Sequence, residues 1–284
     1  MLNRRRISAS LLSLFILSIV TVGLRAQQAT PTKPSADLAG LAHVAIRVHD
    51  LDAAVGFYEK LGFVRAFALS RDGKVYEAFI KINDQQYIEL YPVDAKNTQV
   101  GFLHVCFSGN DLQAAHDYYV QQGLTPNAVR TAGAGNLLFT MPGPATPTGQ
   151  QNMEYTQYMP GSRHTKAIGE FLGADRISTK MVEVAIAFDD PAQAAAFYKD
   201  KVGFTPEKHG VFALPGNSSE AIRVVPAAKL GTKADIVFAA GKDAAKTLEQ
   251  RGVAFTRGAE FGGKGDLTLT DPDGNLIVLQ TTKQ

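Results

Sequence analysis

Two histidines, His43 and His104, occupy matching places in two runs that otherwise have the character of buried strands, LAHVAIRV and FLHVCF. Successive side chains of a strand point to opposite faces, so we expect His43 to share a face with Leu41 and to point away from Val44. A lone histidine in a strand is most often a satisfied core residue. Imidazole is also the commonest metal ligand and titrates near neutral pH, so its repetition at one register points to chemistry.

The elements around these histidines recur along the chain. From His43 to Gly62 and from His104 to Gly123 the spacing is 19 residues, and each segment has a strand, an Asp-Leu helix start, an amphipathic helix and a terminal glycine. A third copy covers 183–204 and a fainter fourth covers 235–255. Short strand-like runs follow each helix, so the repeating unit is predicted to be βαβββ.

Such a unit is too small to bury its own sheet face, so the units are expected to pair into two domains. The predicted domains cover residues 38–160 and 181–284. The connector between them, residues 161–180, contains GSRHTKAIGEFLGADRIST and has enough apolar character to favour a short helix over a loose linker.

The first 26 residues have the composition of a secretory signal peptide. Arg4, Arg5 and Arg6 precede an apolar run over 7–24, and Ala26 suits a signal peptidase. We therefore expect a signal peptide over 1–26, a polar tether over 27–37 and a secreted or periplasmic protein. The alternative is an N-terminal membrane anchor, because about 18 apolar residues approach the minimum length of a span.

Composition bounds the possible partners. The 29 basic and 27 acidic residues leave a net charge of +2, which gives no electrostatic reason to expect nucleic acid. We expect a small-molecule substrate, no membrane contact after signal cleavage, and a possible homodimer. Cys106 is the one cysteine in the chain, so no intramolecular disulfide can form.

After Ala36, nearly the whole chain resembles the vicinal oxygen chelate superfamily, which includes glyoxalases, extradiol dioxygenases and bleomycin-sequestering proteins. The resemblance rests on the repeated FY…LGF phrase and on DPDGN (271–275), a turn common before the last strand of such modules. It implies an α+β fold of four βαβββ modules, paired into two vicinal-oxygen-chelate domains with curved mixed sheets. It does not define a reaction, because these folds host many chemistries.

In the resembling families, metal ligands come from the first and last strands of paired modules. This resemblance implies a metal site of His43, Glu89, His104 and Glu154 in the first domain. Two imidazoles and two carboxylates suit one divalent ion such as Zn²⁺, Ni²⁺, Fe²⁺ or Mn²⁺, which would also compensate their burial. Cys106 lies two residues after His104 and is better explained by packing than as a fifth ligand.

The second domain has different residues at these four places. Alignment of the repeats puts Glu183 and Arg223 at the first two, and Ile236 and Val278 at the others. This domain is expected to keep the fold and lack the site; whether Glu183 and Arg223 form an ion pair or are separately solvated stays open. The remaining histidines are interpreted as structural or surface residues: His49, His116, His164 and His209.

A dication in an open cup binds two neighbouring substrate oxygens and stabilises the negative charge that develops beside them. By resemblance to glyoxalases, Glu154 is the ligand that also acts as catalytic base. The set of two histidines and two glutamates resembles the bacterial glyoxalase set more than the two-histidine, one-glutamate set of extradiol dioxygenases. A tyrosine shortly before a DPxG turn, usual in those dioxygenases, is absent before Glu154.

Export fits poorly with enzymes that need glutathione or reduced iron. The leading hypothesis is therefore an exported divalent-metal-dependent lyase or isomerase of glyoxalase type, acting on a small carbonyl or vicinal-oxygen compound. Two alternatives remain: an extradiol-type ring-cleaving dioxygenase, and a non-catalytic protein that binds a small molecule, as resistance proteins do.

Overall fold

The computed structural model describes residues 36–281, so the predicted signal peptide (1–26) and all but the last two residues of the predicted tether (27–37) lie outside the described residues. Within the described part, no helix is both long and apolar enough to cross a bilayer.

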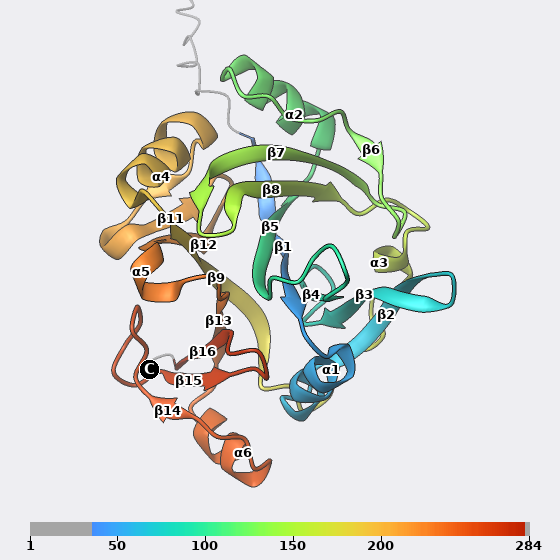
Figure 1. Cartoon of the computed structure of the whole chain (residues 1–284), viewed down its shortest axis with the longest axis vertical. Coiled ribbons are helices and arrows are strands. Elements are labelled where there is room, and N and C mark those ends of the chain that lie inside the picture. The colour runs from blue at the N-terminus through green and yellow to red at the C-terminus, as the bar shows by residue number, and fades with distance from the viewer. Residues whose placement is uncertain (1–35, 282–284) are drawn as a thin grey trace, which may run out of the picture. The chain divides into compact units, whose positions relative to one another are not determined.

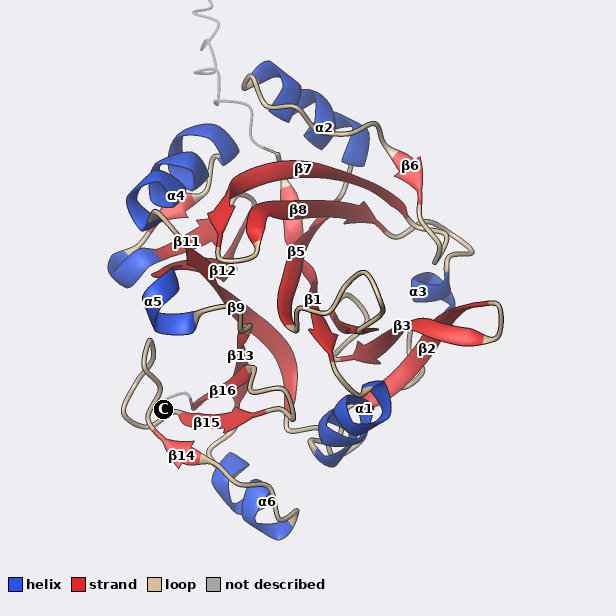
Figure 2. Ribbon diagram, in the orientation of Figure 1, coloured by secondary structure: helices blue, strands red, loops and turns tan. Residues whose placement is uncertain are grey.

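Two eight-stranded mixed sheets form the framework, and helices lie outside the strands in the view of Figure 2. The first sheet has the order β2-β3-β4-β1-β5-β8-β7-β6 and consists of β1 (Leu38–Val48), β2 (Val64–Arg71), β3 (Lys74–Lys81), β4 (Tyr87–Pro92), β5 (Gly101–Gly109), β6 (Arg130–Thr131), β7 (Leu137–Thr146) and β8 (Gly149–Gln157). The second has the order β10-β11-β12-β9-β13-β16-β15-β14 and consists of β9 (Ser178–Phe188), β10 (Thr205–Pro206), β11 (Val211–Leu214), β12 (Asn217–Pro226), β13 (Asp235–Ala240), β14 (Thr256–Arg257), β15 (Leu267–Thr270) and β16 (Leu276–Thr281). The identical order of the two sheets confirms the predicted fold of paired βαβββ modules (Figure 1).

The helices follow the first strands of the modules, as the repeats predict. They are α1 (Leu51–Lys60), α2 (Leu112–Gln121), α4 (Pro191–Phe197), continued by a π-helical turn η1 (Tyr198–Val202), and α6 (Ala244–Gln250); α3 (Arg163–Lys166), α5 (Ala227–Leu230) and the 3-10 turn η2 (Lys208–Gly210) lie in connections. Asp50 caps α1 by accepting hydrogen bonds from the N–H groups of Asp52 and Ala53. Gly62, with φ of 84°, supplies the left-handed residue at which the chain leaves that helix.

A β-bulge in β1 corrects one expectation about the faces of the first sheet. Leu41 pairs with Phe107 and His43 pairs with Cys106, so Ala42 is an extra residue in β1. Neighbouring residues of β5 point to opposite faces, and their partners therefore do so too. The expectation that Leu41 shares the face of His43 is wrong: Leu41 packs in the main hydrophobic core, while His43 points into the cup of the sheet.

That hydrophobic core is continuous through both sheets. The buried apolar residues of the helix-covered faces form one cluster, in which Phe63 packs against Phe238 and Phe107 against Phe204. A buried polar contact also joins β8 of the first sheet to η1 of the second domain, since Gln151 Nε2 donates to Tyr198 Oη at 2.8 Å. The opposite face of each sheet is left free to line a cup.

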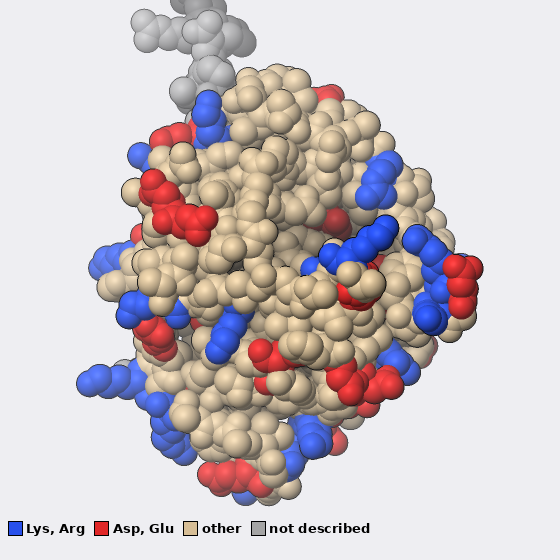
Figure 3. Space-filling view, viewed as in Figure 1, with Lys and Arg blue, Asp and Glu red and all other residues tan. Residues whose placement is uncertain are grey.

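Charged side chains of both signs are interspersed over the face of the molecule in Figure 3, and no broad area of that face carries one sign.

Candidate metal centre

The register of four adjacent strands brings the four predicted ligand residues together. Ala45 on β1 has Glu89 of β4 as its partner on one side and His104 of β5 on the other. Cys106 of β5 lies between His43 on β1 and Glu154 on β8 in the same way. Residues that pair across strands share a face, so all four side chains project into the cup of the first sheet.

The donor atoms of the four side chains cluster around the two ring nitrogens of His43. His43 Nε2 lies 3.2 Å from His104 Nε2 and 3.4 Å from Glu154 Oε1. His43 Nδ1 lies 3.2 Å from Glu89 Oε1, and His104 Nε2 lies 3.7 Å from Glu89 Oε2 and 3.9 Å from Glu154 Oε2. Burial of this cluster, with only 3% of the His43 side chain and 5% of the Glu89 side chain exposed, removes the water that would otherwise solvate it.

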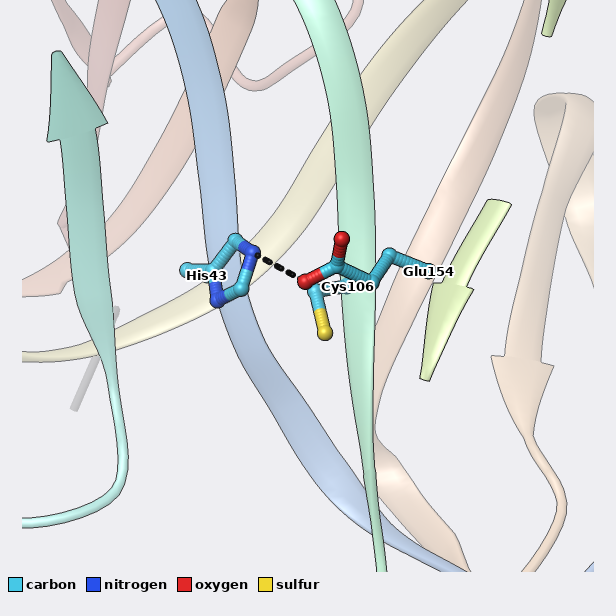
Figure 4. Close-up of side chains that lie close together, drawn as sticks. All are labelled: His43, Cys106 and Glu154. Carbon is cyan, nitrogen blue, oxygen red and sulfur yellow. Dashed lines mark ion pairs between the residues drawn. The ribbon is translucent and has the colours of Figure 1, made fainter. Parts of the chain in front are cut away.

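Figure 4 shows Glu154 directed at His43, with the Cys106 side chain beside them. The Cys106 sulfur is close enough to His43 and Glu154 for the three to form a possible ligand group. Burial raises the pKa of its thiol well above the usual range, and the nearby carboxylates of Glu154 and Glu89 raise it further. Cys106 therefore remains a thiol among these groups unless a cation draws off its proton.

Burial and the contacts between titratable groups shift the pKa values of this cluster in different directions. Burial raises the pKa of Glu89 well above its usual range, with Glu77 and Glu154 adding to the effect. Burial would raise the pKa of Glu154 too, but the contacts of that carboxylate with His104 and His43 outweigh it and bring the pKa to about 2. Burial lowers the pKa of His104 to about 4. The Glu89 carboxyl group thus holds its proton more tightly than the Glu154 carboxyl group does.

The hydroxyl of Tyr91 contacts both Glu89 and a further carboxyl group, that of Glu77. Tyr91 Oη lies 2.7 Å from Glu77 Oε1 and 3.1 Å from Glu89 Oε2. One phenolic hydrogen can serve only one carboxylate, so the second contact needs a proton on a carboxyl group or a cation nearby. The sequence reasoning missed Glu77, although its position two residues before Phe79, the partner of Glu89 in the sheet, would have placed it on the cup face.

These residues fit a divalent ion. Ligands about 2.1 Å from a tetrahedral ion lie roughly 3.4 Å from one another, and the separations of 3.2–3.9 Å among His43 Nε2, His104 Nε2 and the oxygens of Glu154 bracket this value. His43 Nδ1 makes no contact of hydrogen-bond geometry among the described residues, although Glu89 Oε1 lies 3.2 Å away, so these two buried groups lack the partner that a cation would supply. Nitrogen and carboxylate donors are the ligands that divalent first-row metals use.

A cavity of about 170 Å³ opens beside this cluster. Its walls include Glu77, Glu89, Tyr91, Glu154 and His164. Since it ends on two of the four donor residues, a small molecule in it would meet the cluster directly.

His164, which the sequence assigned to a structural or surface role, is buried and also lines the cavity. It lies in the short helix α3, is 2% exposed, and stacks on Tyr158 with ring centroids 4.1 Å apart. Neither ring nitrogen has a hydrogen-bond partner among the described residues, and burial lowers its pKa to about 3. A neutral imidazole therefore lines the cavity, which nothing in its local sequence indicates.

The second sheet corrects the position given to Ile236. Asp235 pairs with Ala185 as His104 pairs with Ala45, so Asp235 is the equivalent of His104. Ile236 is fully buried in the main hydrophobic core on the other face. Glu183 and Arg223 form the ion pair that the sequence left open, with Nε 2.6 Å from Oε1 and Nη2 3.0 Å from Oε2.

Comparison with known proteins agrees with this fold. The family model described as the Glyoxalase/Bleomycin resistance protein/Dioxygenase superfamily matches residues 40–153 and 180–279. The chain therefore belongs to this superfamily, as the resemblance of its repeats predicts. A comparison with curated protein sequences gives no match.

Solved structures with the same fold include enzymes of two kinds. The Mn(II)-bound glyoxalase from Novosphingobium aromaticivorans is 15% identical, with a TM-score of 0.61 over 86% of this chain and 82% of that one. The 2,3-dioxygenase LapB from Pseudomonas sp. KL28 is 14% identical, with a TM-score of 0.60 over 87% of this chain and 93% of that one. At such identities the likeness concerns the fold alone.

Proposed function

We propose that this protein is an exported, divalent-metal-dependent lyase or isomerase of glyoxalase type that acts on a small carbonyl or vicinal-oxygen compound. The observation that carries the proposal is the convergence of His43, Glu89, His104 and Glu154 at the end of a small cavity. The Arg-rich, apolar start of the chain supports export.

In the proposed site, the two histidines and two glutamates would hold the metal. A bound divalent ion would supply positive charge against the negative charge that develops on two neighbouring oxygens of the substrate. The protein's walls would exclude water, because the cluster is almost completely buried.

The two carboxylates are suited to different tasks. The Glu154 side chain is 13% exposed, whereas that of Glu89 is 5% exposed and is held by the hydroxyl of Tyr91. Glu154 is therefore the better placed to accept a proton from a substrate carbon and return it to a neighbouring one, which is the transfer that an isomerase needs. Glu89 would remain a ligand throughout.

A ring-cleaving dioxygenase is the second candidate, and one observation favours it. His43, Glu89 and His104 form a group whose ligand atoms all lie within 4.8 Å of one another. Two histidines and one carboxylate are the donor set of many non-haem iron oxygenases. In that reaction Glu154 would not need to be a ligand.

One set of assays separates these functions. The purified protein is stripped of metal, reloaded separately with Zn²⁺, Ni²⁺, Mn²⁺ or Fe²⁺ under anaerobic conditions, and given α-ketoaldehydes, with and without a small thiol, or catechols with oxygen. Isomerised or rearranged carbonyl product without oxygen uptake would support the proposal. Stoichiometric oxygen uptake with a catechol would replace it by the dioxygenase, and tight binding without turnover of any compound would favour a binding protein. The His43→Ala/His104→Ala double variant is the matched control and should be inactive in every arm.

A further inference from the structure

The cup of the second sheet encloses a cavity of its own. It has a volume of about 170 Å³, as large as the cavity beside the first cluster. Its floor contains the equivalents of the four ligand positions, namely Glu183, Arg223, Asp235 and Val278. The cup of the second sheet therefore contains a cavity, although the side chains that line it differ from those of the first cup.

Asp235 is the unusual member of this set. It is 3% exposed, and its Oδ1 atom has no hydrogen-bond partner among the described residues. Burying a carboxyl group without a partner is costly, and natural proteins seldom keep one that serves no purpose. Asp235 occupies the position in the second sheet that His104 has in the first, and its side chain therefore points into the cavity.

The other charged groups buried around this cavity have partners within the protein. Arg223 donates to both oxygens of Glu183 and, through Nη1, to the backbone oxygen of His209 at 3.0 Å. Asp266 accepts from the N–H groups of Gly263 at 2.6 Å and Thr281 at 3.2 Å. The carboxyl group of Asp235, by contrast, leaves its Oδ1 atom without a partner among the described residues at the floor of the cup.

Part of the remaining wall is apolar, beside the polar side chains of Ser218, Ser219 and Gln280. Val237 flanks Asp235 on β13, Val278 lies opposite Val237 on β16, and Phe261 also lines the cavity. Among the described residues, no group of three or more metal-ligand atoms converges in this cup, which disfavours a metal ion, and the charge of the nearby Arg223 guanidinium is offset by Glu183. An organic cation with one charged end and an apolar body matches both features of the wall.

We propose that the cup of the second sheet binds a small organic ammonium ion, whose N–H groups hydrogen-bond to Asp235 and whose apolar body packs against Val237, Val278 and Phe261. The site is separate from the proposed metal centre and does not depend on its function. The second domain is then a ligand-binding module that would respond to an amine while the first performs the chemistry.

The test uses the full mature protein, ¹⁵N-labelled and kept in excess chelator so that no metal binds the amine. Three probes of similar shape and different charge are titrated at pH 8: benzylammonium, benzyl alcohol and benzoate. The proposal expects benzylammonium to shift the amide signals of Val237 and Val278, with benzyl alcohol at least ~10-fold weaker. Equal binding of the alcohol, preferred binding of benzoate, or no shift at these amides with any probe would overturn it.

Two variants and one control localise the contact. Asp235→Asn should weaken benzylammonium by about 10-fold or more, while Glu207→Gln, which removes an exposed carboxylate from the same cavity wall, should change it by less than ~2-fold. Val278→Leu should reduce binding by filling the cavity, and it tests the site with Asp235 in place. Unchanged affinity in both Asp235→Asn and Val278→Leu would contradict the assignment.

Discussion

The Nε2 atoms of His43 and His104 lie 3.2 Å apart, although 61 positions separate the two residues in the chain. They meet because β1 and β5 are the first strands of two modules and pair at the centre of the sheet. Each module by itself carries half of the candidate metal site, so the site exists only when the modules pair.

The first prediction concerns metal content. The mature protein should bind about one divalent ion per chain, and His43→Ala/His104→Ala should abolish most of this binding, because two of four donors are lost. Elemental analysis after dialysis measures it. Arg223→Ala, at the position in the second sheet that Glu89 has in the first, should leave the metal content unchanged. Undiminished stoichiometry in the double variant would sink the assignment.

The second prediction separates the two glutamates. Glu154→Gln should keep most of the metal and lose roughly 10²-fold or more in turnover, the usual contribution of a positioned base. Glu89→Gln should lower the metal content first. Both quantities are measured on one preparation of each variant, with a substrate found in the assays above. Normal turnover by Glu154→Gln alongside an inactive, metal-loaded Glu89→Gln would reverse the roles.

The third prediction tests the support behind Glu89. Tyr91→Phe removes the hydroxyl that contacts Glu77 and Glu89, and it should weaken metal binding about 10- to 100-fold, as expected for a residue that orients a ligand. Competition against a chromophoric chelator gives the affinity. Tyr119→Phe is the matched control, because the Tyr119 hydroxyl is buried and has no hydrogen-bond partner within residues 36–281. Equal affinities in the two variants would show that Tyr91 does not position Glu89.

The fourth prediction concerns pH. Burial raises the pKa of Asp235 to about 7, with Glu183 adding to the effect and Arg223 opposing it. The folded protein thus holds a proton that the unfolded chain has released, so this group stabilises the fold fully below pH 4 and loses that contribution as pH rises to about 7. Asp235→Asn should therefore gain stability over the parent protein across this range, by up to about 4 kcal/mol. Denaturant unfolding at pH 4, 5.5 and 7 measures the difference, and a constant difference would refute the burial argument.

The fifth prediction concerns the N-terminus. If residues 1–26 are a signal peptide, the exported protein should begin near Gln27, because Ala26 ends the apolar segment with a small residue. N-terminal sequencing of the protein from the exported fraction and from membranes decides the matter. Recovery of intact Met1 in the membrane fraction would instead indicate an anchor.

Much of this protein was determined by local sequence pattern. The repeated strand, helix and terminal glycine predicted the modules, since such periodicity depends on residues close in the chain. The matching histidines and glutamates could be located because the strands that carry them share one repeat. Because equivalent strands pair, these histidine and glutamate side chains then had to lie on one face of the sheet.

The tertiary structure decided what depends on register and on contacts between distant segments. Ile236 and Val237 are both apolar, so the hydrophobic pattern does not show which of them faces the cup. The alignment of the repeats was therefore displaced by one residue, and Asp235 was not recognised as the equivalent of His104. The bulge at Ala42 moved Leu41 to the core in the same way. Tyr91 reaches Glu77 across neighbouring strands, and His164 enters the cavity from a connector. Such contacts depend on how distant segments pack together, so they cannot be predicted from the local hydrophobic pattern.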